Sequence, residues 1–306
     1  MLLIGENIHI ISKSVREALV SRDRDFIVNL LKKQDTVDYI DLNIGPAKGE
    51  LENILPWLVE VVQSNSKQGL SFDTTNFNEL KAGFGVCRNV ENVFINSTTR
   101  DDEKLETLTE LAFQNDCKLI ALTMSKSTGI PKTADERMGL AFEMYEKFME
   151  KEILSENVFF DPLVLPVSVD QGQALEVLHT IQMIKESFDP PVNTIIGLSN
   201  ISNGASKEIR PLINRVFAVM AFGAGLDAAI VDGCDKELIR IIRMLECGKP
   251  ESEKDKLYQN IAQMIGGFSE LDDVEYCKKD VEQVQIIKTA EVLLGKTVYS
   301  QSFTQI

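Results

Sequence analysis

The sequence predicts an α/β fold, a (β/α)8 TIM barrel, from three observations. Short apolar runs alternate with longer stretches of helical periodicity, which is typical of repeated βα units and a parallel sheet. Eight such runs can be counted, and 306 residues are enough for one barrel of about 250 residues with an addition. A doubly wound open sheet is the alternative. It favours a Gly-rich turn after the first strand, but GENIH contains only Gly5 and no GxGxxG occurs.

Each predicted strand is a short apolar run that reaches polar residues at its end. The first, LLIGENI, ends in an acid and an amide, and GLSFDTT ends in an acid and two hydroxyls. The eight predicted strands are residues 2–8, 39–45, 69–75, 93–98, 118–124, 158–165, 193–200 and 227–233.

The segments between the strands carry apolar residues at three- and four-residue spacing, which predicts amphipathic helices. These helices are expected over residues 15–34, 51–63, 103–114, 134–152, 174–188, 211–225 and 234–247. The next segment, 248–280, is polar and irregular, and a helix resumes at 281–295. We therefore predict a single barrel domain over 1–306, in which 248–280 is a partly helical, peripheral insertion with little core of its own.

Charge and cysteine content exclude several classes of function. The chain carries 32 basic and 47 acidic residues, a net charge of −15, so nucleic acid and anionic membranes are not expected partners. No run approaches the roughly 20 apolar residues of a membrane span. The N-terminus lacks the basic and apolar regions of a signal peptide. The five cysteines form no CxxC motif, and their odd number argues against a full set of disulfides, so we expect a cytoplasmic protein.

Polar side chains are concentrated at the predicted strand ends, where barrel enzymes carry their active sites. An isolated Asp or Asn after a strand is often the N-cap of the next helix, and Asp135 and Asp235 are predicted caps of this kind. Asp161 differs, because Pro162 and an apolar LVLP follow it and no helix starts there. The strand-end residues are Glu6, Asn7, Asp41, Asn43, Asp73, Asn76, Asn96, Thr123, Ser125, Lys126, Asp161, Ser199, Asn200 and Asp232.

This mixture of carboxylates and amides suits a ligand with both donors and acceptors, such as a flat heterocycle with an amino-amide edge. The chain has only two histidines, and no DxD or DxE pair lies at a strand end, so no bound metal is predicted. There is no GxSxG motif, and Cys234 has no nearby histidine. Chemistry at this mouth is therefore expected to depend on the positioning of two bound reactants.

Eight motifs give the sequence a family resemblance. In chain order they are YIDLNIGPA, FDTTN, INST, ALTMSKSTGIPK, FFDPLVLP, GLSNIS, RPLINRVFAVM and DAAIVDGCD. This order resembles the methyltetrahydrofolate:corrinoid protein methyltransferases, which are pterin-binding barrels related to the folate-binding region of methionine synthase and to dihydropteroate synthase. The likeness covers residues 1–247 and resumes over 281–303.

The resemblance implies roles for individual residues. The pterin's amino-pyrimidine edge would be held by Asp73, Asn96 and Asp161. Asn200, in GLSN, would contact the ring nitrogen that carries the methyl group and act as the catalytic residue. The folate tail would lie toward the mouth near Asn7, Asn203, Lys207 and Arg210, although Arg210 equally suits a structural pair at a helix start.

The resemblance further implies a methyltransferase that moves a methyl group between a ring nitrogen of tetrahydrofolate and the cobalt of a corrinoid. Methyltetrahydrofolate or tetrahydrofolate would be the substrate, a partner protein would carry the corrinoid, and the enzyme would be a homodimer. Such an enzyme serves either acetyl-CoA synthesis or a demethylase system, and the insertion favours an O- or N-demethylase component.

Two alternatives remain. One is a non-catalytic folate- or pterin-binding protein. The other is a dihydropteroate synthase-like enzyme, whose late Ser-Arg-Lys loop and terminal Arg-x-His do not occur here.

Overall fold

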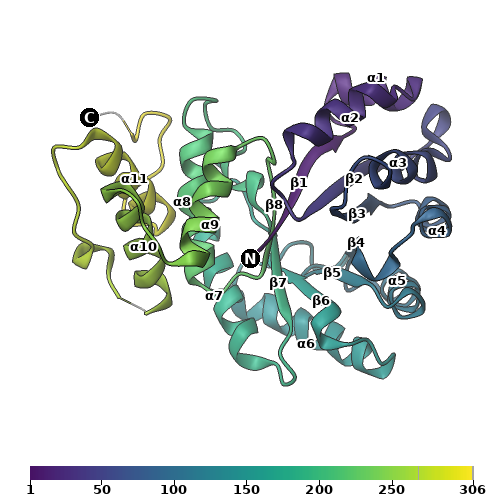
Figure 1. Ribbon diagram of the computed structural model, residues 1–306. Coiled ribbons are helices and arrows are strands. Elements are labelled where there is room, and N and C mark those ends of the chain that lie inside the picture. Colours follow the sequence, from purple (N-terminus) through teal and green to yellow (C-terminus); the bar gives the residue numbers. More distant parts are fainter. Residues whose placement is uncertain (268, 305–306) are drawn as a thin grey trace.

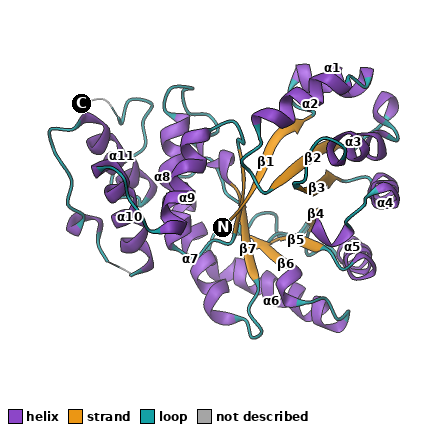
Figure 2. Cartoon of the chain, in the orientation of Figure 1, coloured by secondary structure: helices purple, strands orange, loops and turns teal. Residues whose placement is uncertain are grey.

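A computed structural model of the chain, which describes residues 1–267 and 269–304, confirms the predicted barrel. Its strands are all parallel and close in chain order, with β8 pairing back to β1 (Figures 1 and 2). The strands are β1 (Leu2–His9), β2 (Tyr39–Gly45), β3 (Gly69–Thr74), β4 (Val93–Thr98), β5 (Lys118–Leu122), β6 (Val158–Asp161), β7 (Asn193–Gly197) and β8 (Ala228–Val231).

Helices surround the strands on the outside of the barrel (Figure 2). The α-helices are α1 (Lys13–Ser21), α2 (Arg24–Lys33), α3 (Ile54–Gln63), α4 (Phe77–Val86), α5 (Asp102–Asn115), α6 (Ala134–Glu150), α7 (Gln173–Ser187), α8 (Arg210–Gly223), α9 (Lys236–Cys247), α10 (Glu253–Gly266) and α11 (Val281–Leu293). The 3₁₀ helices are η1 (Gly49–Leu51), η2 (Val90–Asn92), η3 (Ser155–Asn157), η4 (Leu198–Ser202) and η5 (Leu271–Asp273). Within the described residues, no helix is long and apolar enough to cross a membrane.

Five strands, β3, β5, β6, β7 and β8, end earlier than the sequence predicts, and the largest differences are at β6 and β7. The prediction of a strand through residue 165 is wrong, because the chain turns after Asp161. The Asp161 carboxylate accepts a hydrogen bond from the Leu163 N–H at 2.7 Å, and Leu163 has a φ of 66°. The strand predicted to reach residue 200 ends at Gly197, and the GLSN motif continues as η4. Both differences lie at the mouth, where loops replace strands.

Two helix predictions also need correction. The helix predicted over residues 15–34 is two helices, because Arg22 adopts a left-handed conformation and Asp23 then caps α2 by accepting from Phe26 N–H. Asp235 caps α9, as predicted, by accepting from Leu238 N–H. Asp135 is not a cap; Thr133 takes that position in a capping box at the start of α6.

An apolar layer fills the inside of the barrel. It is separate from the larger core between strands and helices, and its aromatic members pack edge to face, Tyr39 on Phe94 at 4.9 Å and Phe94 on Phe159 at 4.8 Å. On β3 the corresponding position is Gly69, where a Cβ would lie 2.2 Å from the Tyr39 ring. We call this layer the inner floor; its buried members are Ile4, Tyr39, Phe94, Ile120, Phe159, Ile195 and Ala228.

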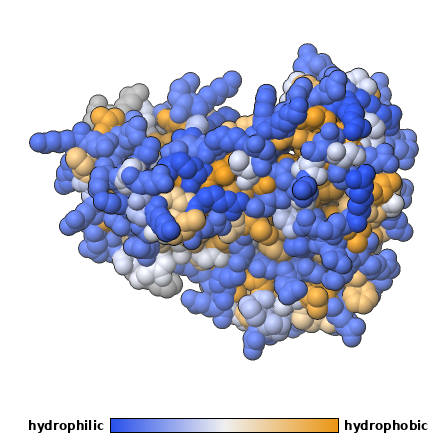
Figure 3. All heavy atoms as spheres, viewed as in Figure 1, coloured by the Kyte–Doolittle hydropathy of each residue, from blue (hydrophilic) through white to orange (hydrophobic). Residues whose placement is uncertain are grey.

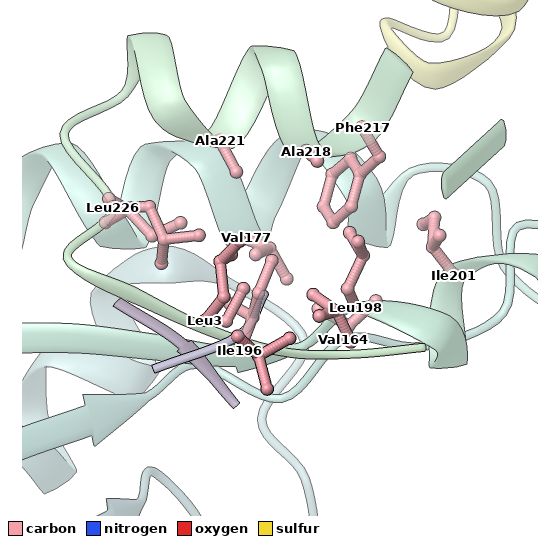
Figure 4. Packing of buried hydrophobic residues seen from close by; sticks show 14 of the residues in the cluster. Leu3, Val164, Val177, Ile196, Leu198, Ile201, Phe217, Ala218, Ala221 and Leu226 are labelled. Atoms are coloured by element: carbon pink, nitrogen blue, oxygen red, sulfur yellow. The ribbon is translucent and has the colours of Figure 1, made fainter. Parts of the chain in front are cut away.

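The main core lies between the barrel wall and the helices. In Figure 4 the α8 side chains Phe217, Ala218 and Ala221 point toward Ile196 on β7 and Leu3 on β1, all of them buried. On the face in Figure 3, hydrophilic side chains dominate and apolar ones form small, separate patches. Both features agree with a water-facing helical shell.

The segment after the barrel packs on α8, and Figure 1 shows α10 and α11 on the side of α8 away from the strands. Helix α10 buries an apolar face that includes Leu257, Ile261 and Ile265. The two helices approach so closely that a Cβ on Gly223 would lie 2.2 Å from the Ala262 carbonyl oxygen. Residue 268, within the predicted insertion, lies outside the described residues. The predicted single domain over 1–306 stays a prediction.

Candidate active site

Four polar side chains stand above the inner floor. Each comes two positions after a floor residue on its own strand, and alternate side chains of a strand share a face. They therefore point into the mouth at the C-terminal ends of the strands. We call these four residues the polar ring; they are Glu6, Asp41, Asn96 and Asp161.

Asp73 lies beside the polar ring at the end of β3. The barrel register sets Asp73 next to Asn43 on β2 and next to Asn96 on β4. The Asn43 amide donates a hydrogen bond to the Asp73 carboxylate. Burial raises the pKa of Asp73 to about 6, although the Asn43 hydrogen bond and the charge of Lys104 lower it. Asp73 is not a helix cap, because Asn76 caps α4 instead.

Asp41 is a buried carboxylate that supports Asn96. Its Oδ1 accepts from Ser71 Oγ at 2.6 Å and from Asn96 Nδ2 at 3.3 Å. Burial and the nearby Asp73 charge raise the pKa of Asp41, while these two hydrogen bonds lower it. The donor side of the Asn96 amide is thereby used inside the wall, which leaves its oxygen to accept from a ligand.

Asp161 lies at the end of β6, where only 7% of the residue is exposed. Burial raises its pKa to about 7, although the hydrogen bond from the Leu163 N–H and the positive charge of Arg137 lower it. Arg137, on α6, is itself completely buried and donates from Nη2 to Gln173 Oε1 at 2.6 Å. Its Nε and Nη1 have no partner among the described residues. Arg137 is not predicted from the sequence, because an arginine within a helix is usually exposed and no pattern around it indicates that it is buried behind a strand end.

Asn200 is exposed on η4, after β7. Its Oδ1 accepts from Asn203 Nδ2 at 3.4 Å. The loop after β6 holds this turn, since Val167 N–H donates to the Ile201 carbonyl at 3.0 Å and Ser168 Oγ donates to the Asn203 carbonyl at 2.7 Å. Asn200 thus has a fixed backbone and a side chain open to the mouth.

The residues predicted to meet a folate tail fall into two groups. Asn203 and Lys207 are exposed on the turn and loop that precede α8. Arg210 donates from Nε to the Ala205 carbonyl at 2.9 Å, so part of its guanidinium serves the helix start. Asn7 donates to Asp232 Oδ1 at 2.7 Å and accepts from Gly233 N–H at 2.9 Å, which ties β1 to the loop after β8. Their roles toward a ligand stay predictions.

Taken together, the mouth offers carboxylates and one amide oxygen above an apolar floor. Both Asp73 and Asp161 have pKa values raised toward neutrality, so each gains most from a ligand that brings N–H donors. Within residues 1–267 and 269–304, no three or more His, Cys, Asp or Glu side chains gather in a group that could hold a metal ion. The arrangement suits a flat, donor-rich heterocycle.

A family comparison agrees with this site. Residues 41–232 match the family described as pterin binding enzyme. This chain belongs to the pterin-binding enzymes. The match begins at Asp41 and ends at Asp232, so it contains every proposed pterin contact.

Curated relatives of this chain include a methyltransferase and a methionine synthase. The chain is 28% identical over 247 residues to the methylcorrinoid:tetrahydrofolate methyltransferase of Eubacterium limosum, covering 79% of this chain and 89% of the relative. It is 26% identical over 248 residues to methionine synthase of Mycobacterium tuberculosis, covering 76% of this chain but only 20% of that longer protein.

Solved structures with the same barrel include dihydropteroate synthases. One from Yersinia pestis, solved with a pterine-sulfa conjugate, has a TM-score of 0.55 at 13% identity and covers 80% of this chain and 94% of its own. One from Coxiella burnetii, solved with pteroic acid, has a TM-score of 0.53 at 13% identity and covers 79% and 92%. These likenesses show the pterin-binding barrel fold.

Proposed function

We propose that this pterin-binding enzyme is a methyltransferase that moves a methyl group between a ring nitrogen of tetrahydrofolate and the cobalt of a corrinoid protein. The observation that carries the proposal is the 28% identity to a methylcorrinoid:tetrahydrofolate methyltransferase across 89% of that relative's length. The polar ring supports it, because its acceptors suit a pterin. In this proposal the corrinoid is a substrate carried by a partner protein.

Asp73, Asn96 and Asp161 are the proposed contacts of the amino-pyrimidine edge. A pterin presents an amino group and a ring N–H, which carboxylates and an amide oxygen can accept. Leaving one of these buried groups unpaired costs about 1–3 kcal/mol, so the site discriminates against heterocycles without those donors.

Asn200 is the proposed catalytic residue. Its amide can donate to a neutral nitrogen or accept from a protonated one, so it can stabilise the methylated ring nitrogen in either state. Its exposure on η4 leaves it accessible to the methyl group that crosses between substrate and partner. Such a contact acts on the transition state more than on binding.

The pathway is a narrower proposal. The name of the Eubacterium limosum relative places methylcorrinoid first and tetrahydrofolate second, which favours transfer toward tetrahydrofolate in a demethylase system over supply of acetyl-CoA synthesis. A homodimer and a cytoplasmic location are also proposed, from the family resemblance and the cysteine content. The folate tail is placed near Asn203, Lys207 and Arg210.

A spectroscopic assay tests the activity. The protein is mixed with tetrahydrofolate and a methylated corrinoid, first free methylcobalamin and then purified corrinoid proteins, and the corrinoid absorbance is followed. Conversion of methyl-cobalt with formation of methyltetrahydrofolate supports the proposal. Tight tetrahydrofolate binding without conversion of any of these corrinoids contradicts it and favours a binding protein. Condensation of p-aminobenzoate with a pterin diphosphate would instead indicate a dihydropteroate synthase.

A further inference from the structure

Glu6 belongs to the polar ring, but the proposed pterin contacts do not use it. Its Oε1 accepts a hydrogen bond from Ser199 Oγ at 2.5 Å. Glu6 lies on β1 and Ser199 follows β7, and β8 separates these two strands in the barrel. A contact between them therefore crosses the inside of the mouth. Ser199 directly precedes Asn200, so Glu6 lies on the same side of the mouth as the proposed catalytic residue.

The strand order decides which part of a bound pterin can face Glu6. If Asp73, Asn96 and Asp161 hold the amino-pyrimidine edge, that edge faces β3, β4 and β6. The opposite part of the ring system, with the nitrogen that carries the methyl group, then faces β7, β8 and β1. On this side of the barrel, Glu6 is the carboxylate that contacts η4, the short helix that carries Asn200.

The reaction needs a group that exchanges one proton at this nitrogen. Toward tetrahydrofolate, the nitrogen lone pair forms the new N–C bond, and the cobalt–carbon bond breaks with its electron pair left on cobalt. The nitrogen then has four bonds and a positive charge, and it becomes neutral by losing its proton. In the reverse direction a proton must reach the nitrogen, because a neutral tertiary amine leaves poorly. Asn200 has no titratable proton to supply.

We propose that Glu6 is a further catalytic residue, which accepts this proton when tetrahydrofolate is methylated and returns it in the reverse reaction. The inference rests on the proposed methyl transfer and deepens it. The Ser199 hydrogen bond fixes the carboxylate beside the Asn200 turn, and its second oxygen remains for the substrate.

The surroundings of Glu6 suit proton exchange. Burial raises its pKa, the Ser199 hydrogen bond lowers it, and the negative charge of Asp232 raises it further. The titratable groups that face it are Asp232 after β8 and Asp41 on β2. No cation forms an ion pair with Glu6 in the part of the chain that the structure describes. A carboxyl group with a raised pKa is a better match for proton transfer near neutral pH.

Single-turnover methyl transfer in both directions tests the proposal. For the intact protein, the rate toward tetrahydrofolate should rise with pH, because the base must be ionised, and the reverse rate should fall. Glu6→Gln should lower both rates by about 100-fold or more and flatten both profiles, with the tetrahydrofolate Kd changed less than about threefold. Glu6→Asp should restore part of the rate. A Glu6→Gln enzyme with the original rates and pH profiles overturns the proposal, as does one that loses affinity alone.

A second measurement needs no turnover and separates this inference from the proposed function. Calorimetric titration with methyltetrahydrofolate in buffers of different ionisation enthalpy gives the number of protons taken up on binding. A net proton uptake that is lower in Glu6→Gln than in the intact protein supports Glu6 as the proton carrier, even if every corrinoid fails as a substrate. Equal proton uptake in both proteins overturns the inference, whatever the outcome of the methyl-transfer assay.

Discussion

The side-chain amide of Asn96 donates to the buried carboxylate of Asp41 at 3.3 Å. This contact uses the Asn96 amide as a donor and leaves its oxygen available as an acceptor. The same hydrogen bond stabilises the ionised form of Asp41, whose pKa is raised by burial and by the charge of Asp73. The proposed pterin contact at Asn96 is therefore also a hydrogen-bond donor to the barrel wall.

Asn96→Asp should lower both the stability of the protein and its affinity for tetrahydrofolate. The new carboxylate would lie against Asp41, two like charges in a buried site, and would remove the donor that Asp41 uses. We expect a lower midpoint of thermal unfolding, and a tetrahydrofolate Kd raised about 5- to 150-fold, which corresponds to 1–3 kcal/mol. Asn96→Ser, which keeps a hydroxyl donor, is the matched comparison. Unchanged affinity in Asn96→Asp would remove Asn96 from the pterin site.

Substitutions of Asn200 and Asp161 should affect different constants, the single-turnover rate in one case and the folate Kd in the other. Asn200→Ala removes the proposed contact to the reacting nitrogen, so we expect a loss of about 100-fold or more in the single-turnover rate with a nearly unchanged folate Kd. Asp161→Ala removes a proposed binding contact, so its main effect should be on Kd. Binding calorimetry and stopped-flow absorbance measure the two quantities. Equal losses of rate and affinity in both variants would contradict the division of roles.

Folate affinity should depend on pH through the two raised carboxyl groups. Asp73, with a pKa of about 6, and Asp161, with a pKa of about 7, accept from N–H donors more strongly, and through both oxygens, when they are ionised. Tetrahydrofolate binding should therefore strengthen as the pH rises from 5 to 8, and Asp161→Asn should lose the upper part of this dependence. Calorimetry across this range provides the check. Affinity that falls as the pH rises would contradict the assignment.

Stability should change with pH in the opposite sense. The folded-state pKa of Asp161, about 7, lies above its ordinary value of 3.8, so folded protein holds a proton that the unfolded chain releases. This contribution is complete below pH 4 and is lost as the pH rises through 7. At pH 8, Asp161→Asn should raise the free energy of unfolding by about 1–4 kcal/mol. Asp135→Asn, at an exposed position, is the control. If Asp161→Asn does not raise the free energy of unfolding at pH 8, burial of the ionised Asp161 does not destabilise the folded protein.

The C-terminal residues should influence the Asn200 turn. Gln301 donates from Nε2 to the Gly204 carbonyl at 2.9 Å and accepts from Ser206 N–H at 2.9 Å, just after the turn. Gln301→Ala should lower the methyl-transfer rate about 3- to 10-fold, roughly the worth of one or two hydrogen bonds, with an unchanged folate Kd. Gln114→Ala, on the outer face of α5, is the matched control. A rate equal to that of the control would make this contact irrelevant to the turn.

The packing of α10 on α8 can be tested by adding one carbon atom. Gly223→Ala would place a Cβ against the Ala262 carbonyl and should cost about 1–3 kcal/mol of unfolding free energy. Gly139→Ala, in the middle of α6 with open space around it, should instead stabilise by up to about 1 kcal/mol. Denaturant unfolding of both variants gives the comparison. If the two substitutions have the same effect, the close helix contact is not present in solution.

The sequence predicts the barrel well because its signals are local and repeated. Each strand is a compact apolar run and each helix has a regular period, so the alternation survives errors at individual boundaries. The errors occur where a single residue redirects the chain. Examples are Arg22 between α1 and α2, and Leu163 after β6, whose positive φ values no apolar pattern encodes.

The candidate site is only partly predictable for a related reason. The strand ends identify Asp73, Asn96 and Asp161 as candidates, and the alternation of side chains above Ile4 and Tyr39 also points to Glu6 and Asp41. The partners of these residues come from distant parts of the chain, as in the pairing of Glu6 with Ser199. Such contacts depend on closure of the barrel, so only the structure reveals them.

A structure of the protein with bound tetrahydrofolate is the decisive test of the proposed pterin site. We expect the amino-pyrimidine edge to form hydrogen bonds with Asp73, Asn96 and Asp161, above the inner floor. The ring nitrogen that accepts the methyl group should lie beside Asn200, on the side of Glu6. A pterin bound outside the mouth, or bound with its amino group toward Glu6 and Asp232, would contradict the proposed site.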